Sequence, residues 1–151
     1  MMVARVSIVA IAYDTLAQAT TIAVRYSAVR RQGFKDTGTG QQSAGGPGGG
    51  IGAEHVVLDY QMQQYRLFKA LSLSYCLLWN KRYIIDYIRR VRGAIDGGDE
   101  SAADGLPELH ATLSGMKAAA TVWAHEGIEE CRKCCGGQGF LKVRFRSFAC
   151  L

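Results

Sequence analysis

The sequence lacks the features that would assign the chain to a membrane, to the secretory pathway or to nucleic acid. The apolar stretch at its amino terminus is shorter than the ~18 residues of a spanning helix, and Arg5 and Asp14 interrupt it. This stretch also has no small-residue cleavage site of the kind that ends a signal peptide. No motif of a nucleic-acid-binding module is present. We therefore expect no membrane span, no secretory signal and no nucleic-acid partner.

The cysteines do not form the pattern of a disulfide-stabilised chain. There are five, an odd number, which indicates a reducing compartment when no secretory signal is present. Cys131, Cys134 and Cys135 lie on one face of a predicted helix, and His125 is near them in sequence. Structural zinc sites usually combine two short clusters of ligands, whereas only one is present here. We predict packed, reduced thiols and no metal site, and a zinc-binding domain is an alternative that rests on this cluster alone.

The composition is that of an ordinary globular chain. Its 151 residues predict one domain, and hydrophobic residues make up 48% of them against 21% charged residues. The net charge is +5. Part of this charge lies at predicted helix ends, where cations are favoured by the helix dipole. The charge by itself therefore does not require an anionic partner.

Apolar residues recur every three to four positions and predict three long helices. The first spans Val3–Arg31 and the second Glu54–Ile95. The third runs for ~28 residues, about 42 Å at 1.5 Å per residue, from Pro107 to a stop at Gly136. The glycine-rich segment 33–52 has no Gly-Lys-Ser/Thr ending and no preceding strand, so we interpret it as a flexible connector rather than a phosphate-binding loop. The expected fold is all-α, an up-down bundle of three helices with no sheet.

Two ends of these predicted helices have residues suited to a ligand. Arg25, Arg30 and Arg31 lie in the last turns of the first helix, and spacing alone allows either a capped helix end or an anion clamp. The third helix ends in the glycine-rich turn 136–139, where glycines can adopt the left-handed conformation and leave the backbone open to a large ligand. By contrast, the glutamines at the start of the second helix are typical surface amides (Gln61, Gln63 and Gln64).

Several segments resemble peroxisomal acyl-CoA oxidases, which belong to the acyl-CoA dehydrogenase superfamily. The most specific is HEGIEECRKCCGGQGF, which resembles the segment that runs into the CGGxG(F/Y) turn of these enzymes. The others are LPELHATLSGMKA, HVVLDYQMQQYRLFKALSLSYCLLW and RYSAVRRQ. Together they imply a truncated fragment that corresponds to the first C-terminal helical domain. This domain would span residues 1–141 around the glycine-rich loop, with 142–151 as an irregular, unmatched tail.

The resemblance implies contacts with FAD, largely with the cofactor held by a neighbouring subunit, and therefore a homodimer formed through the helical domains. The implied contact residues are Arg30, Gln32, Phe34, Tyr60, Gln61, Gly136, Gly137 and Gly139. The chain departs from the family at one point, because it has Gln32-Gly33-Phe34 where the family has Gln-Phe-Gly. The aromatic ring is therefore displaced by one residue.

The resemblance also implies a peroxisomal enzyme that oxidises acyl-CoA to trans-2-enoyl-CoA and forms hydrogen peroxide. In the family a glutamate downstream of the CGGxG turn takes the α-proton, but the residues after Gly139 include no acid. We therefore expect no catalytic residue in this chain and no activity of the chain alone. The last residues, Ala149-Cys150-Leu151, are not the Ser-Lys-Leu address of peroxisomal proteins. The alternative is a non-catalytic helical module for oligomerisation or interaction.

Overall fold

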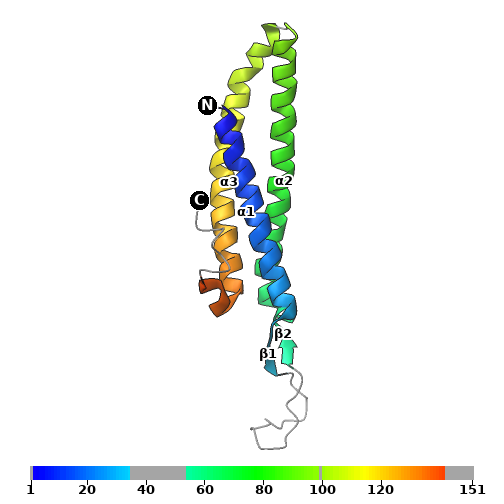
Figure 1. Ribbon diagram of the computed structural model, residues 1–151, viewed down its shortest axis with the longest axis vertical. Coiled ribbons are helices and arrows are strands. Elements are labelled where there is room, and N and C mark those ends of the chain that lie inside the picture. Colours follow the sequence, from blue (N-terminus) through cyan, green and yellow to red (C-terminus); the bar gives the residue numbers. More distant parts are fainter. Residues whose placement is uncertain (1, 35–53, 99, 142–151) are drawn as a thin grey trace, which may run out of the picture.

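The computed structural model describes residues 2–34, 54–98 and 100–141. Three long helices account for most of them: α1 (Met2–Val29), α2 (Gln61–Asp96) and α3 (Leu106–Cys134). They run alternately down, up and down the long axis of the molecule (Figure 1). This arrangement confirms the predicted all-α up-down bundle. Residues 35–52 of the predicted connector and the tail 142–151 lie outside the described residues.

A short two-stranded ladder lies beyond the lower ends of α1 and α2 (Figure 1). Strand β1 (Arg31–Phe34) pairs antiparallel with β2 (Glu54–Val56). The amide of Val57 adds a hydrogen bond of 2.9 Å to the carbonyl of Arg30. The prediction of a chain without any sheet is therefore wrong at this point, although the bundle itself is helical.

The ladder also corrects two predicted helix boundaries. The first helix ends at Val29 rather than at Arg31, and the second begins at Gln61 rather than at Glu54. Gly33 has a φ of 86°, which few residues other than glycine adopt. Between β2 and α2, the 3₁₀ turn η1 (Val57–Asp59) ends at Tyr60, whose backbone is extended. The predicted start of the second helix was wrong because apolar residues at helical spacing continue into this segment.

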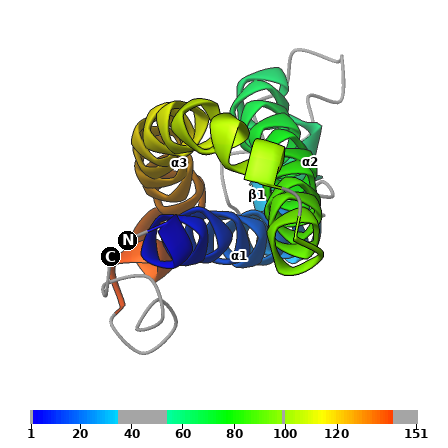
Figure 2. The same cartoon turned by 90° about the horizontal axis from the view of Figure 1, so that it is seen from above.

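The three helices lie around a common centre (Figure 2), and each contributes small and aliphatic side chains to the core. On α1 the fully buried apolar residues recur every three to four positions (Val9, Ala12, Leu16, Ala19 and Ala23). Helices α1 and α3 lie close together at Gly127, because a Cβ atom there would lie 2.6 Å from Cδ1 of Leu16. The absence of a side chain at Gly127 lets Leu16 fill the space between the two helices.

The third helix begins and ends where the sequence predicts. The 3₁₀ turn η2 (Glu100–Gly105) leads into α3, and Pro107 lies in its first turn, where its missing N–H costs no hydrogen bond. At the other end the helix stops at Cys134, and the 3₁₀ turn η3 (Gly136–Phe140) folds back beside it. This turn lies at the lower end of α3 (Figure 1).

The outer face of α2 has an exposed aromatic stripe. It consists of Tyr65, Phe68, Tyr75, Trp79 and Tyr83, which are between 54% and 68% exposed. At 100° per residue these side chains fall on the face opposite the buried residues of the same helix, Leu67 and Leu77 among them. Large exposed apolar patches mark surfaces that contact other proteins or domains. The α2 aromatic stripe is therefore a candidate surface for packing against another domain or chain.

Helix α1 is long and apolar enough to cross a membrane by length and composition, with a mean hydropathy of 1.3 over its best window between Ala4 and Val29. Arg5 and Asp14 do not take the helix below that criterion, and the expectation of no membrane span stays a prediction. Core helices of soluble bundles meet the same criterion. In this structure the buried residues of α1 pack against α2 and α3.

Candidate functional site

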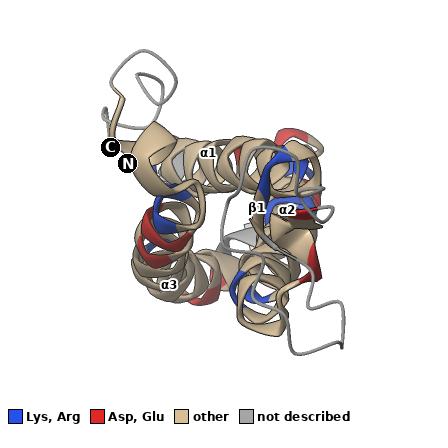
Figure 3. Cartoon of the chain, turned by 90° about the horizontal axis from the view of Figure 1, so that it is seen from below, with Lys and Arg blue, Asp and Glu red and all other residues tan. Residues whose placement is uncertain are grey.

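The candidate cofactor residues all lie at the lower end of the bundle, in three segments. Arg30 follows α1, and Gln32 and Phe34 belong to β1. The second segment is the start of α2, with Tyr60 and Gln61, and the third is η3, with Gly136, Gly137 and Gly139. Seen from this end, basic residues lie beside β1, while α3 has both basic and acidic residues (Figure 3).

The first two segments are joined by Tyr60. Its hydroxyl donates a hydrogen bond of 2.9 Å to the carbonyl of Gln32. A Cβ atom at Gly33 would collide with the same hydroxyl, so the glycine that displaces the aromatic residue of the family pattern is what lets Tyr60 reach β1. The side chains of Arg30, Gln32 and Gln61 are exposed. The side chain of Phe34 lies outside the described part of the chain.

The end of α1 is positively charged and open to solvent. Arg25, Arg30 and Arg31 are all exposed, and none of them forms a salt bridge with the residues that the structure describes. The exposure of Arg30 leaves its guanidinium open to solvent. Guanidinium groups that have no carboxylate partner are available to an anion, and their planar fork matches a phosphate.

The glycine turn is built differently from the sequence prediction. Only Gly136 is left-handed, with a φ of 56°, whereas Gly137 and Gly139 have ordinary backbone angles. Gly137 is exposed and has open space around its Cα atom. Gly139 is buried, and a Cβ atom there would collide with the carbonyl oxygen of Arg132. Gly139 is therefore explained by packing against α3, and the open backbone lies at Gly136 and Gly137.

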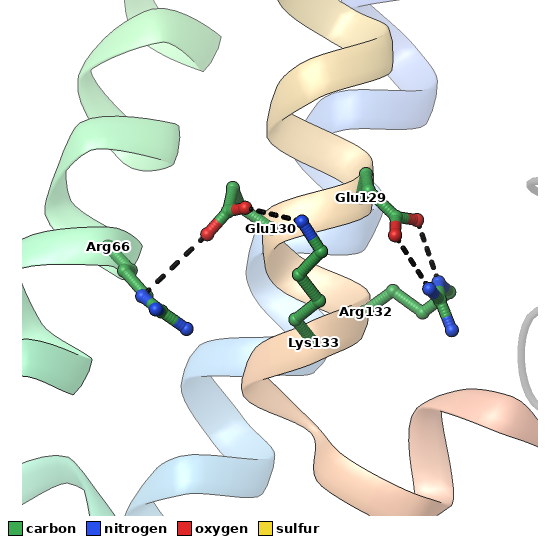
Figure 4. Close-up of polar contacts among 5 residues, drawn as sticks. All are labelled: Arg66, Glu129, Glu130, Arg132 and Lys133. Atoms are coloured by element: carbon green, nitrogen blue, oxygen red, sulfur yellow. Dashed lines mark hydrogen bonds and ion pairs between the residues drawn. The ribbon is translucent and has the colours of Figure 1, made fainter.

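The charged side chain of Arg132 connects this turn with α3, and Figure 4 shows its hydrogen bonds to Glu129. Arg132 donates two hydrogen bonds to Glu129, of 2.7 and 2.6 Å, and its guanidinium lies 4.3 Å from the centre of the Phe140 ring. The hydrogen bond from Arg132 lowers the pKa of the Glu129 carboxyl. Arg132 thus links the last turns of the helix to the end of η3.

Glutamates 129 and 130 also face a groove of about 490 Å³ between α2 and α3. Lys133 donates a hydrogen bond of 2.9 Å to Glu130, and Arg66 lies 3.8 Å from the same carboxylate (Figure 4). The groove brings together three cations and three carboxylates: Arg66, Lys69, Lys133, Glu126, Glu129 and Glu130. Its charges largely balance, so it offers neither an anion nor a cation a strong site.

One residue of this end was missed from the sequence. The side-chain nitrogen of Gln63 donates to the hydroxyl oxygen of Ser27 and to the carbonyl of Cys134, with both distances 2.9 Å. Gln63 is half-buried, so the interpretation of it as a surface amide is wrong, whereas Gln61 is exposed as that interpretation requires. Its partners are 36 and 71 positions away in the sequence, so the local sequence pattern does not predict this contact.

The cysteines near the glycine turn are reduced thiols packed in the core, as predicted. Cys131, Cys134 and Cys135 are at most 8% exposed. Burial raises the pKa of the Cys131 thiol to about 12 and also raises the pKa of Cys134, so both stay protonated at neutral pH. Among the described residues, no three His, Cys, Asp or Glu side chains are placed to hold a metal ion.

The fold and its lower end define a helical-bundle domain with an open, basic face beside a glycine turn. Residues 1–145 match the family model described as acyl-CoA oxidase, C-alpha1 domain. The chain belongs to this family.

Known relatives agree with this assignment. The chain is 41% identical to mouse peroxisomal acyl-coenzyme A oxidase 1 over 140 residues, which cover 93% of this chain and 19% of that protein. Acyl-CoA oxidase 1 of Arabidopsis thaliana superposes with a TM-score of 0.75 at 38% identity, over 93% of this chain and 19% of that one. Acyl-CoA oxidase-1 of Caenorhabditis elegans, complexed with FAD and ATP, gives 0.77 at 33% identity over 97% and 20%. The chain therefore spans about a fifth of the length of these relatives.

Proposed function

We propose that this chain is the FAD-contacting helical domain of a peroxisomal acyl-CoA oxidase. The observation that carries the proposal is the lower end of the bundle, where three distant segments present an exposed cationic cluster and an open glycine turn. In the complete enzyme FAD would accept the hydride as acyl-CoA becomes trans-2-enoyl-CoA, and oxygen would be reduced to hydrogen peroxide. This chain would supply cofactor contacts and subunit-interface helices to a homodimer.

The residues at this end fit a dinucleotide. Arg30 offers an unpaired cation for a phosphate, and Gln32 and Gln61 offer exposed amides for polar groups of the cofactor. The backbone at Gly136 and Gly137 has no side chain that would keep a flat or charged group at a distance. The arginine cluster and the glycine turn belong to separate segments of the chain, so each can contact a different part of the cofactor.

Replacing Arg30 with alanine should weaken the binding of FAD by about tenfold to a hundredfold, the cost of about 1.5–3 kcal/mol for a lost charge-assisted hydrogen bond. The experiment uses a chimera in which this chain replaces its matching segment in the C. elegans oxidase that binds FAD. The dissociation constant of FAD is measured by flavin fluorescence on the deflavinated chimera.

Arg92→Ala is the matched control, because Arg92 is an exposed arginine of the last turns of α2, at the other end of the bundle. Equal affinities in the parent, Arg30→Ala and Arg92→Ala chimeras would contradict the assigned cofactor contact. A parent chimera that folds but retains no FAD would contradict the proposed function as a whole.

The chain by itself should produce no hydrogen peroxide from FAD and acyl-CoA. A base that removes the α-proton must reach substrate in its ionised form. In the family this base follows the CGGxG turn, but the residues after Gly139 include no acid, and the groove carboxylates Glu129 and Glu130 are engaged in ion pairs with Arg132, Lys133 and Arg66. A peroxidase-coupled assay of the purified chain measures this, with the complete C. elegans enzyme as the positive control. Turnover clearly above the protein-free rate would show that the chain contains its own catalytic base.

A second candidate function is a helical interaction module without turnover, which the exposed α2 aromatic stripe favours. Such a module would bind its partner through the α2 aromatic stripe, and this binding would not require the exposed arginine cluster. The chimera separates the two functions, because only a cofactor-contacting domain makes flavin retention depend on Arg30.

A further inference from the structure

One side-chain amide joins the helix ends that lie next to the three candidate cofactor segments. The side-chain nitrogen of Gln63, in the first turn of α2, donates both of its hydrogens, one to Ser27 on α1 and one to the carbonyl of Cys134 on α3. Ser27 is fully buried and lies three residues before Arg30. Cys134 ends α3 and lies two residues before Gly136.

The bond to Cys134 has a physical function of its own. The last four carbonyl groups of a helix have no partner within the helix, and a buried polar group without a partner is unfavourable. Gln63 gives the last carbonyl of α3 a donor from another helix, at the point where the chain turns into η3. The position of the glycine turn therefore depends on a side chain of α2.

Through the hydrogen bond to Ser27, the position of the end of α1 also depends on Gln63. Ser27 is the last buried residue of α1 before the exposed cluster. Beyond it, the amide of Arg30 donates a backbone hydrogen bond of 2.8 Å to the carbonyl of Tyr26. Gln63 thus fixes the end of α1 relative to the end of α3, and Tyr60, one helical turn earlier, fixes β1.

We propose that Gln63 is a positioning residue for the cofactor. It holds the arginine cluster and the glycine turn in the relative position that one ligand requires, without touching that ligand. This inference rests on the proposed function of the domain. The Cys134 carbonyl can only accept a hydrogen bond, and the Gln63 amide supplies the donor that joins it to Ser27.

The test compares Gln63→Glu with Gln64→Glu in the chimera with the C. elegans oxidase. Glutamate matches the shape of glutamine, but its ionised carboxylate cannot donate to either partner. Gln64 is the adjacent, equally half-buried residue, so its replacement introduces the same charge in the same helical turn. We expect Gln63→Glu to weaken FAD binding by about tenfold and Gln64→Glu to leave it within about twofold of the parent.

A double-mutant cycle separates positioning from general loss of stability. If Gln63 acts by placing Arg30, then Gln63→Glu should cost at least about threefold less affinity when Arg30 is already alanine. The cycle with Arg92→Ala should be additive. Hydrogen exchange of the 151-residue chain provides the structural readout, since backbone amides of Gly136–Phe140 should exchange faster in Gln63→Glu than in Gln64→Glu.

Each outcome decides the inference. A parent chimera that retains no FAD overturns the proposed function, and this inference with it. If the parent binds FAD but Gln63→Glu lowers only the melting temperature and leaves the affinity of the folded protein unchanged, Gln63 is a stability residue and the inference alone fails. An additive cycle with Arg30→Ala also overturns it, because the two residues would then act independently.

Discussion

Replacing Leu16 with alanine should lower the free energy of unfolding of the chain by about 2–5 kcal/mol. Leu16 is fully buried in the centre of α1, where its methyl groups lie over Gly127 of α3. Removing three carbons there loses their transfer free energy and leaves a cavity between two helices that already lie close together. Urea denaturation followed by far-ultraviolet circular dichroism measures the change.

Ile11→Ala is the control for this substitution. Ile11 is an aliphatic residue of the same helix, but it is 47% exposed, so its loss should cost much less. Similar destabilisation by the two variants would show that burial at Leu16 does not determine the stability of α1, and the described core would be wrong.

Gly139→Val should destabilise the chain by about 3 kcal/mol. The new Cβ atom would collide with the carbonyl oxygen of Arg132, which is backbone and cannot move without unwinding the end of α3. We expect η3 to leave the helix and the Phe140 ring to lose its contact with Arg132. The change is measured by urea denaturation and by hydrogen exchange of residues 132–141.

Gly137→Val is the matched control two residues away. Gly137 has no neighbouring atom that a Cβ would meet and no positive φ, so the variant should unfold within about 0.5 kcal/mol of the parent. If valine is tolerated equally at both positions, the turn does not pack on Arg132 as described.

The sequence was sufficient for those parts of the molecule that local spacing determines. The stripe that includes Leu109 and Leu113 predicts α3, and Pro107 and Gly136 mark its ends, because helix boundaries depend on neighbouring residues. The resemblance to acyl-CoA oxidases identified the segments that meet at the lower end. The fold class and the family were therefore predictable, and both are confirmed.

The remaining features depend on contacts between distant segments. Spacing gave no indication that Gly139 packs against the Arg132 carbonyl or that Gln63 joins Ser27 to Cys134. The ladder between β1 and β2 was missed for a related reason, since the segments RQGF and EHV are too short and too polar to show the pattern of a strand until a partner strand is known. In each case the residue that determines the local structure lies far away in the sequence or on the other side of the turn.

Because of the β1–β2 ladder, the relative position of α1 and α2 does not depend on the number of residues that connect the two strands. Phe34 and Glu54 face each other across the ladder, so the distance that residues 35–53 must span is fixed by the ladder and not by those residues. For a flexible connection, doubling the number of residues adds only about 0.6 kcal/mol to the free energy of loop closure. The chain can therefore gain or lose residues between the strands during evolution while the end of α1 and the start of α2 keep their spacing.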